Sequence, residues 1–152
     1  MKKKPIKILV IEDDPGTIAC AVEFIQLCLE KLFPNSITKT EATRRFASKD
    51  PKQKESTASK KLLDEAFDFD LIIAGDLESD GYTTMNVIEF ISMHQKEKLK
   101  NLIVYSFEDK YLNYAEKNGI SFLPKPVTHV GWMVALKRFF EKEKGGFHEN
   151  FY

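Results

Sequence analysis

The sequence predicts an α/β domain built on a five-stranded parallel sheet with helices on both faces. Short β-branched runs alternate along the chain with longer segments in which apolar residues recur every three or four positions. Parallel strands need a crossover connection, which is usually a helix. The length of 152 residues suits one domain with a full core. We therefore expect a single domain over residues 1–144 and a flexible tail over 145–152.

Each expected element rests on a local pattern. Lys7–Ile11 and Asp70–Ala74 are nearly continuous Ile, Leu and Val, which is typical of strands buried on both faces. Ile37–Thr43 is Thr-rich and is expected at the sheet edge. Two more strands are expected at Asn101–Tyr105 and Ile120–Leu123. Helices are expected at about Gly16–Leu32, Ala58–Phe67, Met85–Gln95, Asp109–Asn118 (ended by Gly119) and Val127–Lys144.

Two further segments carry expectations of their own. Arg44–Ser59 is rich in Lys, Ser and Asp, and we expect most of it to be an exposed, mobile loop. The last helix is expected to bury one apolar face, made of Val130, Met133, Val134, Leu136 and Phe140.

Composition excludes several classes of partner. Lys plus Arg (23) balances Asp plus Glu (23), so neither nucleic acid nor an anionic membrane is indicated as a partner. No stretch approaches membrane-spanning length. Cys20 and Cys28 are two turns apart on one expected helix, too far for a disulfide, and resemble small buried hydrophobic residues of a reducing, cytoplasmic protein.

Three consecutive acids, Glu12-Asp13-Asp14, end the first strand. Adjacent carboxylates repel one another and are costly to desolvate, so three of them at the tip of a core strand favour a divalent cation site. Mg²⁺ takes oxygen ligands and keeps several waters, so one or two carboxylates suffice. The alternative is that Asp13 or Asp14 only caps the following helix.

The carboxyl ends of parallel strands gather at one edge of the sheet, where ligands bind. That rule brings the three acids together with Asp76, Ser106 and Lys125, which each follow a later strand. The combination suits phosphoryl transfer: acids hold Mg²⁺, a carboxylate attacks phosphorus, and a hydroxyl and an ammonium bind the phosphoryl oxygens.

The chain resembles the receiver domain of two-component response regulators over about residues 5–143. Three segments carry the resemblance: Lys7–Pro15, Asp70–Ile73 and Gly119–Pro126. The resemblance implies a flavodoxin-like (CheY-like) fold with strand order 2-1-3-4-5 and a cis bond at Lys125-Pro126.

By the same resemblance, the site would accept a phosphoryl group on Asp76 with Mg²⁺ bound. Asp13 would be the chief metal ligand, Glu12 would act through water, and Asp76 and the Glu78 backbone would complete the set. Lys125 would bind the acyl phosphate. Ser106 would be the switch hydroxyl, and Phe122 the aromatic side chain that turns inward with it.

The chain departs from the family pattern in two places. The acceptor aspartate should lie five residues after Asp70, where Gly75 stands, with Asp76 one residue later. A one-residue shift turns a strand side chain to the other face, unless the strand bulges at Gly75. The second departure is Phe107, which stands where the family prefers a small residue and could either restrict access of the donor or turn away from it.

Two hypotheses follow. In the first, the chain is a stand-alone, non-enzymatic receiver. It takes phosphate from a sensor histidine kinase or phosphotransfer protein and signals to an unidentified downstream protein or a second copy of the chain, through the face of strands four and five. In the second, it is a pseudo-receiver, a binding module without a phosphate switch. The retained Glu12, Asp13 and Lys125 favour the first hypothesis, whereas Gly75, Phe107 and the altered loop after Asp76 favour the second.

Overall fold

The computed structural model describes residues 4–47, 50–52, 57–64, 68–77 and 81–143, and it confirms the predicted parallel sheet. The strands lie in the order β2-β1-β3-β4-β5, and each neighbouring pair is parallel. They are β1 (Ile6–Ile11), β2 (Thr38–Thr43), β3 (Leu71–Ala74), β4 (Leu102–Ser106) and β5 (Ser121–Pro124). The helices are α1 (Pro15–Leu32), α2 (Ala58–Asp64), α3 (Thr84–His94), α4 (Asp109–Asn118), α5 (His129–Glu143) and a 3-10 helix, η3 (Lys96–Asn101).

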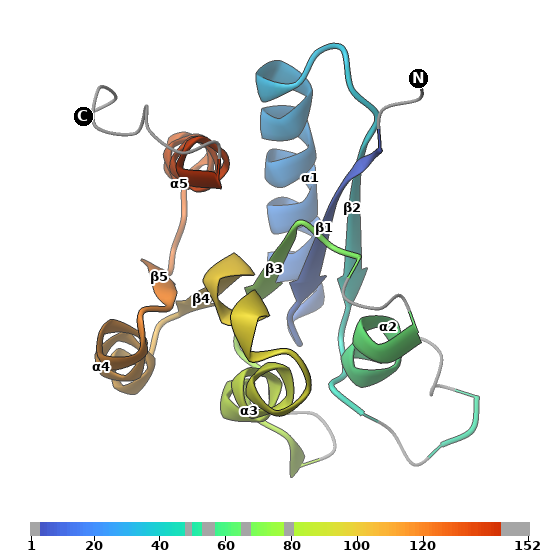
Figure 1. Cartoon of the computed structure of the whole chain (residues 1–152), viewed down its shortest axis with the longest axis vertical. Helices are drawn as coiled ribbons and strands as arrows, with labels where there is room; N and C mark the ends of the chain where they lie inside the picture. The colour runs from blue at the N-terminus through green and yellow to red at the C-terminus, as the bar shows by residue number, and fades with distance from the viewer. Residues whose placement is uncertain (1–3, 48–49, 53–56, 65–67, 78–80, 144–152) are drawn as a thin grey trace.

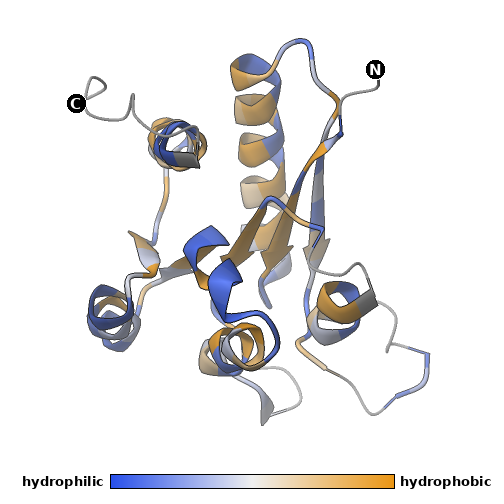
Figure 2. Ribbon diagram, in the orientation of Figure 1, coloured by the Kyte–Doolittle hydropathy of each residue, from blue (hydrophilic) through white to orange (hydrophobic). Residues whose placement is uncertain are grey.

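Helices cover both faces of the sheet. Helices α1 and α5 lie on one face, and α2, α3 and α4 lie on the other (Figure 1). Strand β1 serves both layers, because successive side chains of a strand point to opposite faces. Ile8 and Val10 pack with α1 and α5, whereas Leu9 and Ile11 pack with the other three helices. Figure 2 shows the apolar residues of β1 and β3 in the middle of the molecule, between the helices of the two faces.

The central strands are apolar along their length because neither of their faces is open to water. Every residue of β3 and β4 is buried, as are Ile8–Ile11 of β1. Strand β2 lies at the sheet edge, as its polar composition predicted. The strands that the sequence marked as most buried, β1 and β3, are neighbours, so the residues that follow them lie side by side at the carboxyl edge.

The expected inward face of α5 is partly wrong. Val130 is 71% exposed and Val134 is 47% exposed, while Trp132 and Leu136 are buried. Trp132, Leu136 and Phe139 are spaced by four and three residues, and burying the large indole ring outweighs burying the two valines. Met133 and Phe140 are half-buried against the same core.

The prediction that most of residues 44–59 form an exposed loop is also wrong in part. Phe46 is only 8% exposed, and its ring lies 5.0 Å from that of Tyr82 and 5.5 Å from that of Phe90. The carbonyl oxygens of Arg45 and Phe46 accept hydrogen bonds from the amides of Ala58 and Ser59. An aromatic ring gains enough from burial to anchor the described start of this segment.

Smaller differences concern the cysteines and one connection. Cys28 is buried as expected, but Cys20 is exposed, and both are free thiols. The 3-10 helix η3 was not predicted.

Within the described residues, no helix combines the length and apolar character needed to cross a bilayer. The expected tail over 145–152 lies outside the described residues.

Candidate functional site

The three acids after β1 are placed differently. Glu12 is buried with 1% of its surface exposed, Asp13 is partly exposed and Asp14 is exposed. Asp14 caps α1: its Oδ2 accepts hydrogen bonds from the Thr17 amide at 2.7 Å and the Thr17 hydroxyl at 2.6 Å. These bonds hold the pKa of Asp14 below its usual value. The capping alternative is therefore correct for Asp14. Of the three acids, Glu12 and Asp13 remain the candidate ligands of a cation.

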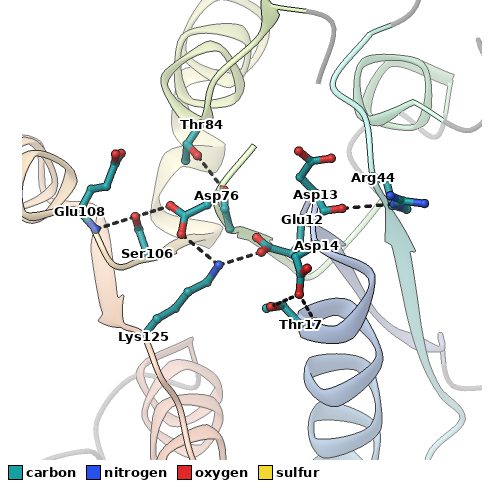
Figure 3. A network of polar contacts seen from close by, with 11 residues as sticks. Glu12, Asp13, Asp14, Thr17, Arg44, Asp76, Thr84, Ser106, Glu108 and Lys125 are labelled. Atoms are coloured by element: carbon teal, nitrogen blue, oxygen red, sulfur yellow. Dashed lines mark hydrogen bonds and ion pairs between the residues drawn. The ribbon is translucent and has the colours of Figure 1, made fainter. Parts of the chain in front are cut away.

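Lys125 joins the carboxyl ends of β1, β3 and β5. Its Nζ lies 2.7 Å from Glu12 Oε1 and 3.0 Å from Asp76 Oδ2, and its side chain is only 4% exposed (Figure 3). The Lys125 amide donates to the Ser106 carbonyl at 3.1 Å, which fixes the backbone beside β4. The predicted cis peptide bond between Lys125 and Pro126 is present.

Asp76 lies in the same pocket despite its one-residue offset. Strand β3 ends at Ala74, so the alternation of side chains no longer applies at Asp76. The Asp76 carbonyl accepts from the Asp13 amide at 3.1 Å, which ties the two loops together. A bulge at Gly75 with unusual dihedrals is not what brings it there, because the positive-φ glycines of the described residues are Gly81 and Gly119.

Gly75 is required by close packing. Its amide donates to the Ile11 carbonyl at 2.7 Å, and its carbonyl accepts from the buried Thr84 hydroxyl at 2.7 Å. A Cβ added at Gly75 would lie 1.9 Å from Glu12 Oε2 and 3.0 Å from Tyr105 Cε1. Both distances are below normal contact. The Glu12 carboxylate therefore occupies the space that a side chain at position 75 would need.

Ser106 completes the contacts of the Asp76 carboxylate. Its hydroxyl donates to Asp76 Oδ1 through a short hydrogen bond and accepts from the Glu108 amide at 3.0 Å. Both oxygens of Asp76 are thus hydrogen-bonded, one to Ser106 and one to Lys125. Phe122, the other expected switch residue, is half-buried against the core beneath α2, α3 and α4.

The electrostatics of the pocket are set by burial. Burial raises the pKa of Glu12 to about 7, against the lowering effect of its hydrogen bond and charge interaction with Lys125. Burial also raises the pKa of Tyr105, whose ring lies 4.5 Å from Lys125 Nζ. Lys125 Nζ lies 5.5 Å from the Phe107 ring centroid as well. The ammonium is thus enclosed by two carboxylates and two aromatic rings.

A cavity of about 550 Å³ opens at this edge of the sheet. Phe107, which is 67% exposed, forms part of its wall and leaves it open. The other lining residues include four acids and two cations: Glu12, Asp13, Asp14, Asp76, Arg44 and Lys125.

The donor set determines what kind of metal ion the cavity could hold. Within the described residues, no three His, Cys, Asp or Glu side chains are grouped closely enough to enclose a metal. The buried Glu12 Oε2 has no hydrogen-bond partner among the described residues. Carboxylates around a roomy, polar cavity fit a Mg²⁺ ion that keeps several waters, and not a dehydrated ion. The Glu78 carbonyl, the remaining predicted ligand, lies outside the described residues.

Two residues at the site were not predicted. Arg44 follows β2, and its Nε donates to the Asp13 carbonyl at 3.2 Å (Figure 3). The rule that gathers carboxyl ends of strands could have found it, because Arg44 directly follows a strand. Thr84 is 1% exposed at the start of α3 and bonds Gly75, and no local pattern in the sequence indicates that contact.

Comparison with known proteins identifies the fold. No protein-family profile matches the chain, and no curated protein sequence matches it. Among solved structures, the beryllofluoride-activated receiver domain of DrrB from Thermotoga maritima is 18% identical, with a TM-score of 0.57 over 91% of this chain and 99% of that one. A receiver domain from Clostridium thermocellum is 18% identical, with a TM-score of 0.61 over 91% and 97%.

A third similar structure is that of a complex of two proteins. It is the P1 domain of CheA3 in complex with CheY6 from R. sphaeroides, with 18% identity and a TM-score of 0.54 over 95% of this chain and 100% of that one. The chain therefore has the CheY-like receiver fold that the sequence predicted.

Proposed function

We propose that this chain is a response regulator receiver that accepts a phosphoryl group on Asp76. The observation that supports it best is the Asp76 carboxylate, held between the Lys125 ammonium and the Ser106 hydroxyl beside an acid-lined cavity. A carboxylate can attack phosphorus, and a neighbouring ammonium and hydroxyl can bind the oxygens of the transferred group.

Asp13 and Asp76 would hold Mg²⁺, with Glu12 acting through water and the Glu78 backbone as a further ligand. When bound, the ion would neutralise charge on the phosphoryl oxygens. Glu12 has a second role, because its ion pair with Lys125 at 2.7 Å fixes the ammonium near the acceptor. Lys125 would then stabilise the transferred group.

In the transfer, an Asp76 oxygen forms a bond to phosphorus while the bond between phosphorus and the donor breaks. Each Asp76 oxygen already accepts a hydrogen bond, one from Ser106 and one from Lys125. After transfer the negative charge lies on the phosphoryl oxygens, so one of these two donors must move to hydrogen-bond a phosphoryl oxygen. We assign that movement to Ser106, because its hydroxyl rotates easily. Phe122 would repack with it and alter the face of β4 and β5.

The phosphoryl donor would be a sensor histidine kinase or a phosphotransfer protein, in keeping with the complex of CheY6 with CheA3. The output would be binding of a downstream protein, or of a second copy through the β4–β5 face, in the cytoplasm. The chain would act alone as a signalling module and not as an enzyme.

A pseudo-receiver remains the second candidate function. It is favoured by Gly75, which stands where the family pattern has its acceptor, and by the ion pair that already engages Lys125. In that case the closed network of Glu12, Asp76 and Lys125 would be a structural element.

Intact-protein mass spectrometry after incubation with Mg²⁺ and acetyl phosphate separates the two functions. We expect the mass of one phosphoryl group to be added to the native chain and none to be added to Asp76→Asn. An unchanged native mass, together with identical beryllofluoride binding by both proteins, would exclude the receiver function and leave the pseudo-receiver.

A further inference from the structure

The cavity is lined by two cations, Lys125 and Arg44, which differ in whether a carboxylate is paired with them. Lys125 is buried and contacts both Glu12 and Asp76. Its attraction for an incoming anion is therefore largely cancelled by these two carboxylates before any ligand arrives.

Arg44 is the cation of the cavity wall that has no carboxylate partner in the described part of the chain. Its side chain is exposed, and its Nε is held by the Asp13 carbonyl at 3.2 Å. That bond orients the guanidinium but uses only one of its five N–H donors. The remaining four suit paired hydrogen bonds to phosphoryl oxygens.

The position of Arg44 complements that of Lys125. Figure 3 shows the Arg44 guanidinium and the Lys125 ammonium on either side of the acids that follow β1. Arg44 also contributes to the lowered pKa of Asp14, after the larger effect of the Thr17 hydrogen bonds, so its positive charge reaches the cavity. Both cations line the cavity, so a phosphoryl group that enters it comes under the positive charge of each.

A cation at this position would favour the approach of an incoming phosphodonor. The phosphodonor carries two negative charges and must approach four acids that line the cavity: Glu12, Asp13, Asp14 and Asp76. At a separation of about 7 Å in water, each unit charge pair contributes roughly 0.6 kcal/mol, which corresponds to about a threefold change in rate. For a doubly charged donor, one arginine would therefore change the rate of association by roughly five- to tenfold at low salt.

We propose that Arg44 is a donor-binding residue, which recognises the dianionic phosphoryl group of the phosphodonor and positions it for attack by Asp76. This inference rests on the proposed function and adds a specificity determinant to it. The guanidinium contacts the donor's phosphoryl oxygens before transfer, and Lys125 and Ser106 receive them afterwards.

The test measures phosphorylation rates with acetyl phosphate, a dianion at neutral pH, as the probe, in native protein, Arg44→Ala, Arg44→Lys and the control Arg138→Ala. Arg138 lies on α5 outside the cavity wall, and its removal changes the net charge equally. We expect Arg44→Ala to react about five- to tenfold more slowly at low salt, Arg44→Lys to recover part of the loss, and Arg138→Ala to be unchanged.

Salt dependence separates binding from a structural role. The deficit of Arg44→Ala should shrink toward the native rate at an ionic strength of about 1 M, because exposed charges are then screened. A deficit that is the same at all salt concentrations, or equal rates for Arg44→Ala and the native protein at low salt, would overturn the proposal.

A binding measurement keeps this inference distinct from the proposed function. Inorganic phosphate is titrated into the native protein, Asp76→Asn and Asp76→Asn/Arg44→Ala, and binding is followed by ³¹P NMR. Weaker binding only when Arg44 is removed would support the Arg44 site even if no phosphoryl transfer occurs. Equal binding to all three proteins would overturn the Arg44 site even if Asp76 is phosphorylated.

Discussion

Replacing Gly75 with alanine tests the closest packing contact of the site. The added Cβ would lie 1.9 Å from Glu12 Oε2, whereas ordinary contact begins near 3.4 Å, so the carboxylate must move by about 1.5 Å. Such a movement breaks or strains the 2.7 Å ion pair between Glu12 and Lys125, both of which are buried.

Breaking a buried ion pair costs about 3–5 kcal/mol. Alanine in place of glycine returns about 0.4–1 kcal/mol by restricting the unfolded chain, and the flexible end of Glu12 relieves part of the strain. We therefore expect Gly75→Ala to lose about 2–3 kcal/mol of unfolding free energy, a fall in Tm of roughly 4–10 °C.

Urea unfolding followed by the fluorescence of the buried Trp132 measures this loss. Two further variants make the interpretation specific. Gly16→Ala is the matched control, because its added Cβ would meet only Asp14 Oδ2 at an ordinary 3.4 Å. In Glu12→Asp/Gly75→Ala, the shorter acid withdraws from position 75, and we expect a favourable coupling energy of about 1 kcal/mol or more.

Equal stability of Gly75→Ala and Gly16→Ala would show that a side chain at position 75 does not compete with Glu12 for space. Additive losses of unfolding free energy in Glu12→Asp and Gly75→Ala would show the same, because the two positions would then not be coupled.

Three other predictions concern the pH response, the helix cap and the buried threonine. Because burial raises the pKa of Glu12 from 4.5 to about 7, the native state binds its proton more tightly than the unfolded state does. In metal-free protein, Glu12 should therefore lower stability by up to about 3 kcal/mol as pH rises from 4.5 to above 7. Urea unfolding at several pH values should show this fall in the native protein and a flatter profile in Glu12→Gln; equal slopes would contradict the assignment. Asp14→Ala should unfold at a lower urea concentration than the native protein because the α1 cap is lost, but it should retain phosphorylation by acetyl phosphate; loss of phosphorylation would place Asp14 in the reactive site. Thr84→Val should lose about 1–2 kcal/mol, because the Gly75 carbonyl loses its buried donor, and a loss as small as that of the partly exposed Thr17→Val control at α1 would contradict that role.

The fold could be predicted from the sequence because its signals are local. Apolar runs bounded by turn residues identified β1 and β3, and helical periodicity identified the crossover helices. The rule for the carboxyl ends of parallel strands then placed Glu12, Asp76 and Lys125 together. These steps need only the order of the elements along the chain.

The remaining features depend on contacts between distant residues. The sequence indicates a possible bulge at Gly75, yet the importance of this glycine lies in the space it leaves for Glu12, a residue 63 positions earlier. The inward face of α5 was misjudged because periodicity does not say that Trp132 takes precedence over Val130 and Val134. The sequence predicts a loop at Phe46, which lies in the core, because an isolated aromatic residue among polar neighbours carries no periodic signal.

Borohydride reduction can detect an acyl phosphate at Asp76 and identify the residue that carries it. The protein is incubated with Mg²⁺ and phosphoramidate, reduced with borohydride and digested, and the peptides are sequenced by mass spectrometry. An aspartyl phosphate is reduced to homoserine, so we predict homoserine at position 76 and at no other acid of the cavity. Unmodified aspartate at position 76, or homoserine at position 13 or 14 instead, would contradict the account.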